Sequence, residues 1–153
     1  MTDSNEVQVR RLGARDRELA RVTFDLMAEV FGEERDRLSD KYLDELLGRS
    51  SVLVFAATEG GRAVGGLTAH LLPMTAYEGA EVFIYDVAVA DEYRRRGVGR
   101  RLLGAISSEA KRLGASNLFV LADVVDTGAL GFYRSLGGAP SSVTLFGFDP
   151  TES

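Results

Sequence analysis

The stretch that decides the fold reads DVAVADEYRRRGVGRRLL and occupies residues 86–103. Its first residues are apolar and β-branched and continue a run from residue 81, which predicts a strand over 81–90. After an acidic turn and a loop, Leu103, Ile106 and Ala110 recur at helical spacing and predict a helix over about 98–113. The stretch therefore predicts a strand, a loop and a helix in direct succession.

The loop between this strand and this helix contains three arginines and two glycines within residues 94–99. Glycines let the backbone approach a ligand closely, and the N–H groups and dipole of a helix start favour an anion. No Gly-Lys-Ser/Thr follows, and Arg100 to Leu102 replace the last glycine of a dinucleotide fingerprint. The loop therefore predicts an anion site and disfavours a nucleotide triphosphatase or a dinucleotide-dependent dehydrogenase. Taken alone, a solvated turn explains it equally well.

The rest of the chain alternates between strand and helix patterns in a simple order. In the first half we predict a strand over 7–12, a helix over 16–31 with Leu19, Val22, Leu26 and Val30 on one face, and a short helix that is capped at Ser39 or Asp40 and ends at Gly48. Strands over 52–58, 63–72 and 81–90 follow, and then the helix over 98–113. The last part has a buried strand over 117–122, a helix that is capped at Asp126 or Thr127 and runs to Leu136, and a strand over 143–148. This order predicts one mixed sheet with helices on both faces.

Composition limits the kinds of site that the chain can hold. The 153 residues are 45% hydrophobic and 27% charged, which predicts a single domain over residues 1–153. The sequence has no cysteine and one histidine, His70, which we interpret as structural, so it predicts no metal site and no cysteine nucleophile. The net charge of −5 disfavours a nucleic-acid partner and suits a small cationic substrate. No apolar run suggests a membrane partner or a signal peptide, so we expect a cytoplasmic protein.

Two segments of the chain resemble the GNAT superfamily of acetyltransferases. Residues 86–103 resemble its acetyl-CoA signature, in which an apolar strand and an acidic loop precede Arg/Gln-x-x-Gly-x-Gly/Ala at the start of a helix. Residues 117–137, which include ALGFYRSLG, resemble its second signature segment. The resemblance implies an α/β fold (an α+β mixed sheet) in the order β-α-α-β-β-β-α-β-α-β, with a mostly antiparallel central sheet that splays at the acetyl-CoA site.

A closer resemblance is to the aminoglycoside 3-N-acetyltransferases of the gentamicin type. It rests on EVFIYDVAV at residues 81–89, on Leu-Leu-Pro at 71–73, on the turn 122–126, on the leucines and tyrosine of residues 42–47, and on Phe-Asp-Pro at 148–150. It implies antibiotic resistance through 3-N-acetylation of an aminoglycoside, by direct attack of the amine in a ternary complex. Because dimers are common among such relatives, we also expect a homodimer.

The superfamily resemblance assigns residues to the coenzyme. A strand at this place pairs through its backbone with the pantetheine arm, and the following loop holds the pyrophosphate. The residues carried over are Val87, Ala88, Val89, Arg94, Arg95, Arg96, Gly97, Val98, Gly99 and Arg100. Core packing explains the apolar side chains of the first three equally well.

Two residues are implied in catalysis. Asp86 is an acid in a mostly apolar strand, where a carboxylate needs a partner or a function. We expect it to orient or deprotonate the substrate amine, and the alternative is a carboxylate satisfied by backbone amides. Tyr133 matches a residue near the coenzyme sulfur that protonates the departing thiolate, and the alternative is an aromatic that packs beside Phe132.

The acceptor site is expected to be acidic. The residues that we assign to substrate binding are Glu78, Glu81, Tyr85, Asp123 and Asp126. Each carboxylate taken singly fits a surface charge, and Asp126 also fits a helix cap. The acceptor stays open between an aminoglycoside and a polyamine, another small amine or a protein N-terminus, and a non-catalytic acetyl-CoA-binding module is a further alternative.

Overall fold

The structure is a computed structural model that describes residues 6–152. These residues form β1 Val7–Arg11, α1 Arg17–Phe31, α2 Asp40–Leu47, β2 Val52–Glu59, β3 Arg62–Pro73, β4 Ala80–Val89, the short 3-10 helix η1 Asp91–Tyr93, α3 Val98–Arg112, β5 Ala115–Val120 and α4 Thr127–Ser135. Internal contacts divide the chain into two units, one that ends at Leu121 and one that begins at Ala122. The prediction of a single domain stays a prediction.

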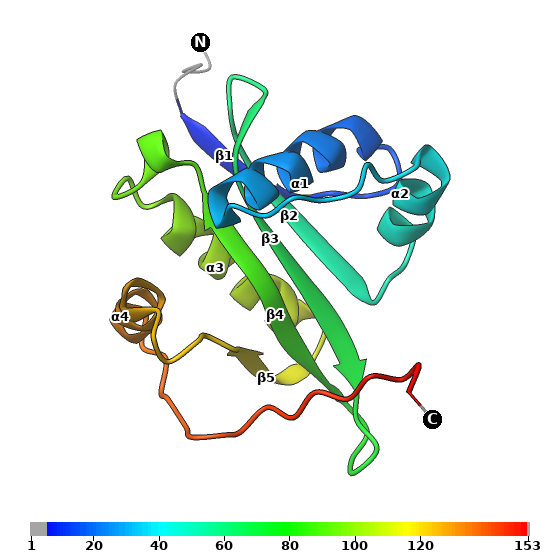
Figure 1. The fold of residues 1–153 in the computed structure, drawn as a ribbon, viewed down its shortest axis with the longest axis vertical. Helices are drawn as coiled ribbons and strands as arrows, with labels where there is room; N and C mark the ends of the chain where they lie inside the picture. Colours follow the sequence, from blue (N-terminus) through cyan, green and yellow to red (C-terminus); the bar gives the residue numbers. More distant parts are fainter. Residues whose placement is uncertain (1–5, 153) are drawn as a thin grey trace. The chain divides into compact units, whose positions relative to one another are not determined.

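The first unit is built on one five-stranded sheet in the order β1-β2-β3-β4-β5 (Figure 1). The first four strands pair antiparallel, and β4 and β5 pair in parallel. The parallel pair follows from the connection, because α3 lies between these two strands and carries the chain back to the starting edge. This arrangement confirms the predicted mixed sheet.

Helices cover both faces of the sheet, as predicted. On one face, α1 and α2 enclose an apolar cluster that includes Phe24, Met27 and Leu43. On the other face, α3 contributes Leu102 and Ile106 to a second cluster with the inward residues of the sheet. The structure therefore has two cores separated by the sheet.

The buried face of α1 differs from the predicted one. Its fully buried side chains include Ala20 and Thr23, whereas Val22, which we placed on the inner face, is 49% exposed. The helix turns its small residues inward because it crosses the sheet at Gly66, where an added Cβ would stand 2.6 Å from Thr23 Cγ2. A bulge also lies beside these glycines, since β2 and β3 shift register between Ala57 and Thr58, next to the pair of Ala57 with Gly65.

Two predictions near the C-terminus are wrong. The strand after α3 is only half-buried rather than buried, because its second edge has no strand beside it within residues 6–152. The predicted strand over 143–148 does not form in the described chain. Its apolar residues are exposed, with Phe148 at 87%, and an alternating pattern makes a strand only where a neighbouring strand supplies hydrogen bonds.

The second unit contains α4 and the extended chain that follows it. As predicted, Asp126 caps the helix, and its Oδ1 accepts a hydrogen bond of 3.0 Å from the Ala129 N–H. After Ser135 the chain leaves the helix through Gly137, which has a φ of 90° that favours glycine. No helix within residues 6–152 has the length and apolar character that a bilayer-spanning helix requires.

Candidate functional site

The open edge of β4 is the first component of the site. Its pairing with β5 ends at Ile84, which lies opposite Val120, whereas its pairing with β3 continues to Val89. Within the described chain, no strand pairs with the β5-facing edge of residues 86–89. Peptide groups on such an edge are free to bond an extended ligand. This length of β4 includes the three residues that we assigned to pantetheine from the sequence.

The start of α3 is the second component. Gly97 precedes the helix in the left-handed conformation with a φ of 80°, and no side chain caps the helix there. Arg95 is also left-handed, with a φ of 61°, so the backbone curls through the loop before the helix begins. Val98 is buried in the core and fixes the helix start. The first N–H groups of a helix lack intrahelical acceptors, so this end offers donors to an anion.

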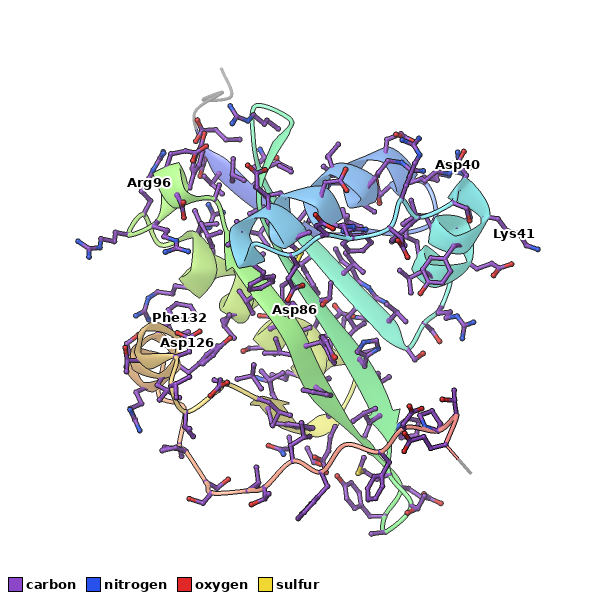
Figure 2. All side chains as sticks on the ribbon, in the orientation of Figure 1. Asp40, Lys41, Asp86, Arg96, Asp126 and Phe132 are labelled. Carbon is purple, nitrogen blue, oxygen red and sulfur yellow. The ribbon has the colours of Figure 1, made fainter. Side chains whose placement is uncertain are left out.

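The arginines of the loop are partly engaged by neighbouring acids. Arg94 Nε lies 3.2 Å from Asp91 Oδ1. Arg96 Nη2 lies 3.4 Å from Glu59 Oε2, and its guanidinium lies 4.5 Å from the centre of the Tyr93 ring (Figure 2). Both arginines remain largely exposed, so their charge is available near the helix start but is partly offset. The backbone donors are thus the fixed part of the predicted anion site.

Asp86 lies on β4 where the open edge begins (Figure 2). It pairs in register with Thr68 and is half-buried, and no hydrogen bond within residues 6–152 involves its carboxylate. Burial raises the pKa of Asp86 above its usual value, and the negative charge of Glu33 raises this pKa further. The alternative of a carboxylate satisfied by backbone amides is therefore not what the structure shows.

Glu33 belongs to a segment, residues 32–39, that returns from the end of α1 to the start of α2 (Figure 1). Gly32 ends α1 with a φ of 67° and turns the chain back. Arg35 then lies over the Phe24 ring at 5.5 Å and 3.8 Å from Asp25 Oδ1, so the segment is held against α1. This packing fixes the place at which the charge of Glu33 acts on Asp86.

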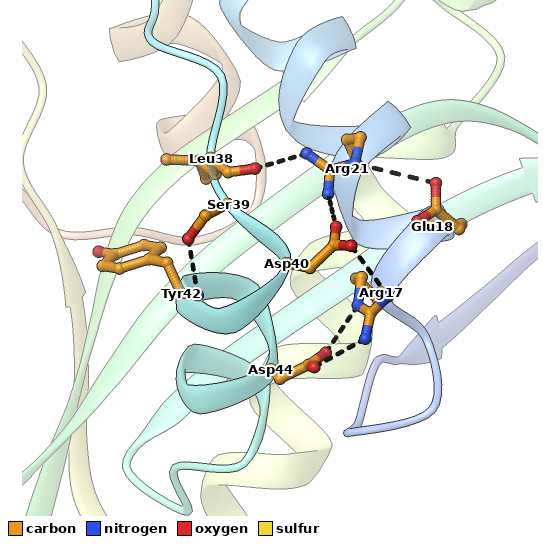
Figure 3. Close-up of polar contacts among 8 residues, drawn as sticks. All are labelled: Arg17, Glu18, Arg21, Leu38, Ser39, Asp40, Tyr42 and Asp44. Carbon is orange, nitrogen blue, oxygen red and sulfur yellow. Dashed lines mark hydrogen bonds and ion pairs between the residues drawn. The ribbon is translucent and has the colours of Figure 1, made fainter.

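An ion-pair network fixes the other end of segment 32–39 (Figure 3). Arg21 donates a hydrogen bond of 2.6 Å to the Leu38 carbonyl and pairs with Asp40. Arg17 bonds both carboxylate oxygens of Asp44 at 2.8 Å. The hydrogen bonds from the Arg17 guanidinium stabilise the ionised form of Asp44, so they lower the pKa of that carboxyl. The network joins α1 to α2 across the segment.

Four rings gather on three neighbouring strands beyond Asp86, and we call them the aromatic platform. They are His70 on β3, Phe83 and Tyr85 on β4, and Phe119 on β5. Phe83 and Phe119 stack with their centroids 4.9 Å apart, Tyr85 lies 5.6 Å from Phe83, and His70 meets Tyr85 edge-on at 6.1 Å. His70, which we interpreted as structural, therefore lies beside a residue assigned to the substrate.

A β-bulge explains why Asp86 and the aromatic platform share a face. Thr68 pairs with Asp86 and Ala69 with Ile84, so Tyr85 is an extra residue in β4. The bulge shifts the alternation by one, and this places Asp86 on the same face as Phe83, three residues before it. Nearer the end of β4, α1 covers this same face, and Ala88 there belongs to the apolar cluster that α1 and α2 enclose.

The other predicted substrate residues divide between the two units. Glu81 lies on β4 and accepts a hydrogen bond of 3.1 Å from Asn117 on β5, and Glu78 is exposed in the turn before β4. Asp123, Asp126 and Tyr133 belong to the second unit. There Asp123 accepts a bond of 3.1 Å from the Val125 N–H, and the Tyr133 ring lies 5.3 Å from that of Phe132. Their place in the site stays a prediction.

Sequence reasoning did not include Glu33, Phe83 or Phe119 in the site. Glu33 is distant from Asp86 along the chain, and no local pattern signals that they interact. Phe83 and Phe119 come together only through the parallel register of β4 and β5. The strands that correspond to β3 and β4 were predicted but their pairing was not, and it is this pairing that places His70 opposite Phe83.

Comparison with known proteins identifies relatives of this arrangement. The acetyltransferase (GNAT) family profile matches residues 19–137. The chain is similar to the aminoglycoside acetyltransferase meta-AAC0020 from an uncultured soil metagenomic sample, crystallised with trehalose, at 32% identity and a TM-score of 0.89 over 94% of this chain and 95% of that one. In its complex with sisomicin that protein matches at 30% identity and a TM-score of 0.90, with the same coverage.

A second relative comes from the same kind of source. The aminoglycoside acetyltransferase HMB0005, also from an uncultured soil metagenomic sample, matches at 29% identity and a TM-score of 0.91 over 95% of this chain and 99% of that one. A search of curated protein sequences gives no match. The structural relatives therefore extend over almost the whole of both chains.

Proposed function

The chain belongs to the acetyltransferase (GNAT) family, and we propose that it transfers the acetyl group of acetyl-CoA to an amino group of an aminoglycoside. The observation that carries the proposal is the end of β4–β5 pairing at Ile84, two residues before Asp86. It leaves an open strand edge between an uncapped helix start and an unpaired, half-buried acid. The similarity to a protein crystallised with sisomicin supports an aminoglycoside as the acceptor.

The residues present fit acetyl-CoA. The open edge of Val87 to Val89 offers peptide groups to the amide-containing pantetheine arm, and the helix start at Val98 offers N–H groups to a pyrophosphate. Arg94, Arg95, Arg96 and Arg100 add positive charge around that start. When bound, the coenzyme supplies an acetyl group activated as a thioester.

The acceptor side depends on Asp86. An ammonium group must lose a proton before its nitrogen can attack, and a carboxylate beside it can accept that proton. The raised pKa of Asp86 makes its carboxylate a better base than an exposed aspartate. Transfer then forms the nitrogen–carbon bond and breaks the carbon–sulfur bond in one direct attack, which requires no covalent enzyme intermediate and so suits a chain without cysteine.

The proposal also assigns roles to residues of the second unit, and it specifies which amino group is acetylated and in what biological setting. Tyr133 protonates the departing thiolate, while Asp123 and Asp126 join Glu78, Glu81 and Tyr85 around the acceptor. The acetylated group is the 3-amino group, the physiological role is antibiotic resistance in the cytoplasm, and the protein acts as a homodimer without a metal.

A thiol-release assay with acetyl-CoA tests the proposal. The acceptor panel contains sisomicin, gentamicin, kanamycin, spermidine and a set of peptides with free N-termini. We expect turnover with the aminoglycosides, with the acetyl group located on the 3-amino nitrogen by NMR of the product. Turnover with spermidine or peptides alone would show that the acceptor is not an aminoglycoside. Binding of acetyl-CoA without turnover of any acceptor would show that the protein is a non-catalytic binding module. Acetylation at another nitrogen would retain the substrate class and correct the position.

A further inference from the structure

One ring of the aromatic platform, that of Tyr85, is exposed to solvent. Tyr85 is 61% exposed although it lies within a strand, because the bulge removes it from the regular alternation of β4. Phe83 and His70 contact its ring from two directions, which limits the orientations that it can take. An exposed ring held in this way is ready to receive a flat apolar surface at a low entropic cost.

Acidic groups lie on both sides of this ring along β4. Asp86 follows Tyr85 directly, and Glu33 acts on Asp86 from segment 32–39. Glu81 lies toward the other end of the strand, where it holds Asn117 on β5. The platform therefore combines aromatic faces with negative charge at both ends, which matches a ligand that carries several ammonium groups on apolar rings.

We propose that the aromatic platform binds a second ring of a multi-ring aminoglycoside while Asp86 receives the amino group to be acetylated; this inference rests on the proposed function. The C–H face of the second ring packs on Tyr85, and its ammonium groups face the aromatic rings and the carboxylate of Glu81. A single-ring amine fills only the end at Asp86. The aromatic platform thus selects the size of the acceptor and does not take part in the chemical step.

The test compares two acceptors in a Tyr85→Ala variant of the full chain. Sisomicin has several rings, and 2-deoxystreptamine has one. We expect KM for sisomicin to rise about two- to fivefold, in line with loss of one exposed cation–aromatic contact, with little change in kcat. KM for 2-deoxystreptamine should change less than about twofold. Equal changes for the two acceptors would overturn the proposal.

A matched control separates the aromatic platform from general effects of losing a surface tyrosine. Tyr42 on α2 is 52% exposed and lies outside the platform, so Tyr42→Ala should leave both KM values unchanged. Light scattering of Tyr85→Ala at assay concentrations tests another occupant. A shift to a smaller particle with unchanged KM values would show that a second copy of the chain covers the platform, and would overturn our assignment.

Calorimetry distinguishes failure of this inference from failure of the proposed function. Sisomicin is titrated into wild-type protein and into Tyr85→Ala without acetyl-CoA. A Kd that rises about two- to fivefold in the variant supports the platform even if no acetylation is found. If sisomicin is acetylated but its Kd is the same in both proteins, the proposed function is supported and the role of the aromatic platform is refuted. If sisomicin does not bind to the wild type, both proposals are refuted.

Discussion

Gly66 on β3 and Thr23 on α1 lie so close that a methyl group on Gly66 would stand 2.6 Å from Thr23 Cγ2. Met27 Sδ would lie 2.7 Å from the same methyl group. Thr23 is fully buried, and its hydroxyl donates a hydrogen bond of 2.7 Å to the Leu19 carbonyl, so its side chain has little freedom to move aside. This contact sets how closely α1 approaches the sheet, and it therefore sets the position of Glu33 just beyond the helix.

We expect Gly66→Ala to lower the free energy of unfolding by about 1–3 kcal/mol, because overpacking forces α1 or β3 to shift. Urea denaturation measures this change. Gly104 on α3 is exposed and has no neighbour within 4 Å of an added Cβ, so Gly104→Ala serves as the control. It should be neutral or stabilising by up to about 1 kcal/mol. Equal stability of the two variants would show that the contact does not limit the helix.

The Glu33→Gln variant should shift the acidic limb of the pH profile of kcat/KM to lower pH. Protonated Asp86 cannot accept a proton, so activity falls as pH decreases through its pKa. Removal of the negative charge at Glu33 lowers this pKa and extends activity into more acidic solution. Glu34→Gln is the control, because Glu34 is not among the groups that act on Asp86. An unchanged limb in both variants would show that the charge of Glu33 does not act on the titrating base.

Asp86→Asn should reduce kcat at least about 100-fold and also stabilise the protein at neutral pH. The folded state raises the pKa of Asp86, so the ionised carboxylate costs stability. Below the pKa that Asp86 has in the unfolded chain, the carboxyl is protonated in both states and does not destabilise the fold. As pH rises through the higher pKa that it has in the folded protein, this protonated form is lost and stability falls. Urea denaturation should thus show the variant more stable than wild type at pH 7.5, with the difference vanishing below about pH 4. A less stable variant at pH 7.5 would contradict a raised pKa.

We expect Gly97→Ala to raise KM for acetyl-CoA about five- to tenfold with little effect on KM for the acceptor. An added Cβ meets no neighbour, so the cost comes from the positive φ of 80°, and a cost of about 1–1.4 kcal/mol for an L-residue corresponds to this rise in KM. Gly114 at the other end of α3 has a φ of 73° and equal space, which makes Gly114→Ala a control for the same strain. Steady-state kinetics should show no change in KM for that control. A similar rise in both would point to loosening of α3 and not to the loop.

Arg21→Ala should increase amide exchange in segment 32–39 about tenfold, since it removes the hydrogen bond to the Leu38 carbonyl together with the pair to Asp40. Hydrogen–deuterium exchange measured by mass spectrometry reports this directly. Arg17→Ala removes ion pairs to α2 without touching Leu38, and it should affect the segment less. If exchange of the segment is the same in wild type and Arg21→Ala, the contact to Leu38 does not hold it.

Much of the fold was predictable because its signals are local. Gly97 and Gly114 bound α3, Ser39 caps α2 with an acceptor for the Tyr42 N–H, and Asp126 caps α4. Each signal acts within a few residues, so the chain needs no tertiary partner to express it. The faces of the helices were harder to predict, since α1 buries Thr23 in place of Val22 to pass close to Gly66.

The sequence by itself determined the strands and α-helices up to α4 and the loop of residues 94–99, because turn residues, caps and periodicity are properties of neighbouring residues. Only the tertiary structure decided that β4 parts from β5 at Ile84, that the bulge exposes Tyr85, and that Glu33 acts on Asp86. It also left residues 143–148 without a strand partner within the described chain. These features depend on strand register and on contacts between distant segments, and a pattern along one chain carries no information about which neighbour a strand edge receives.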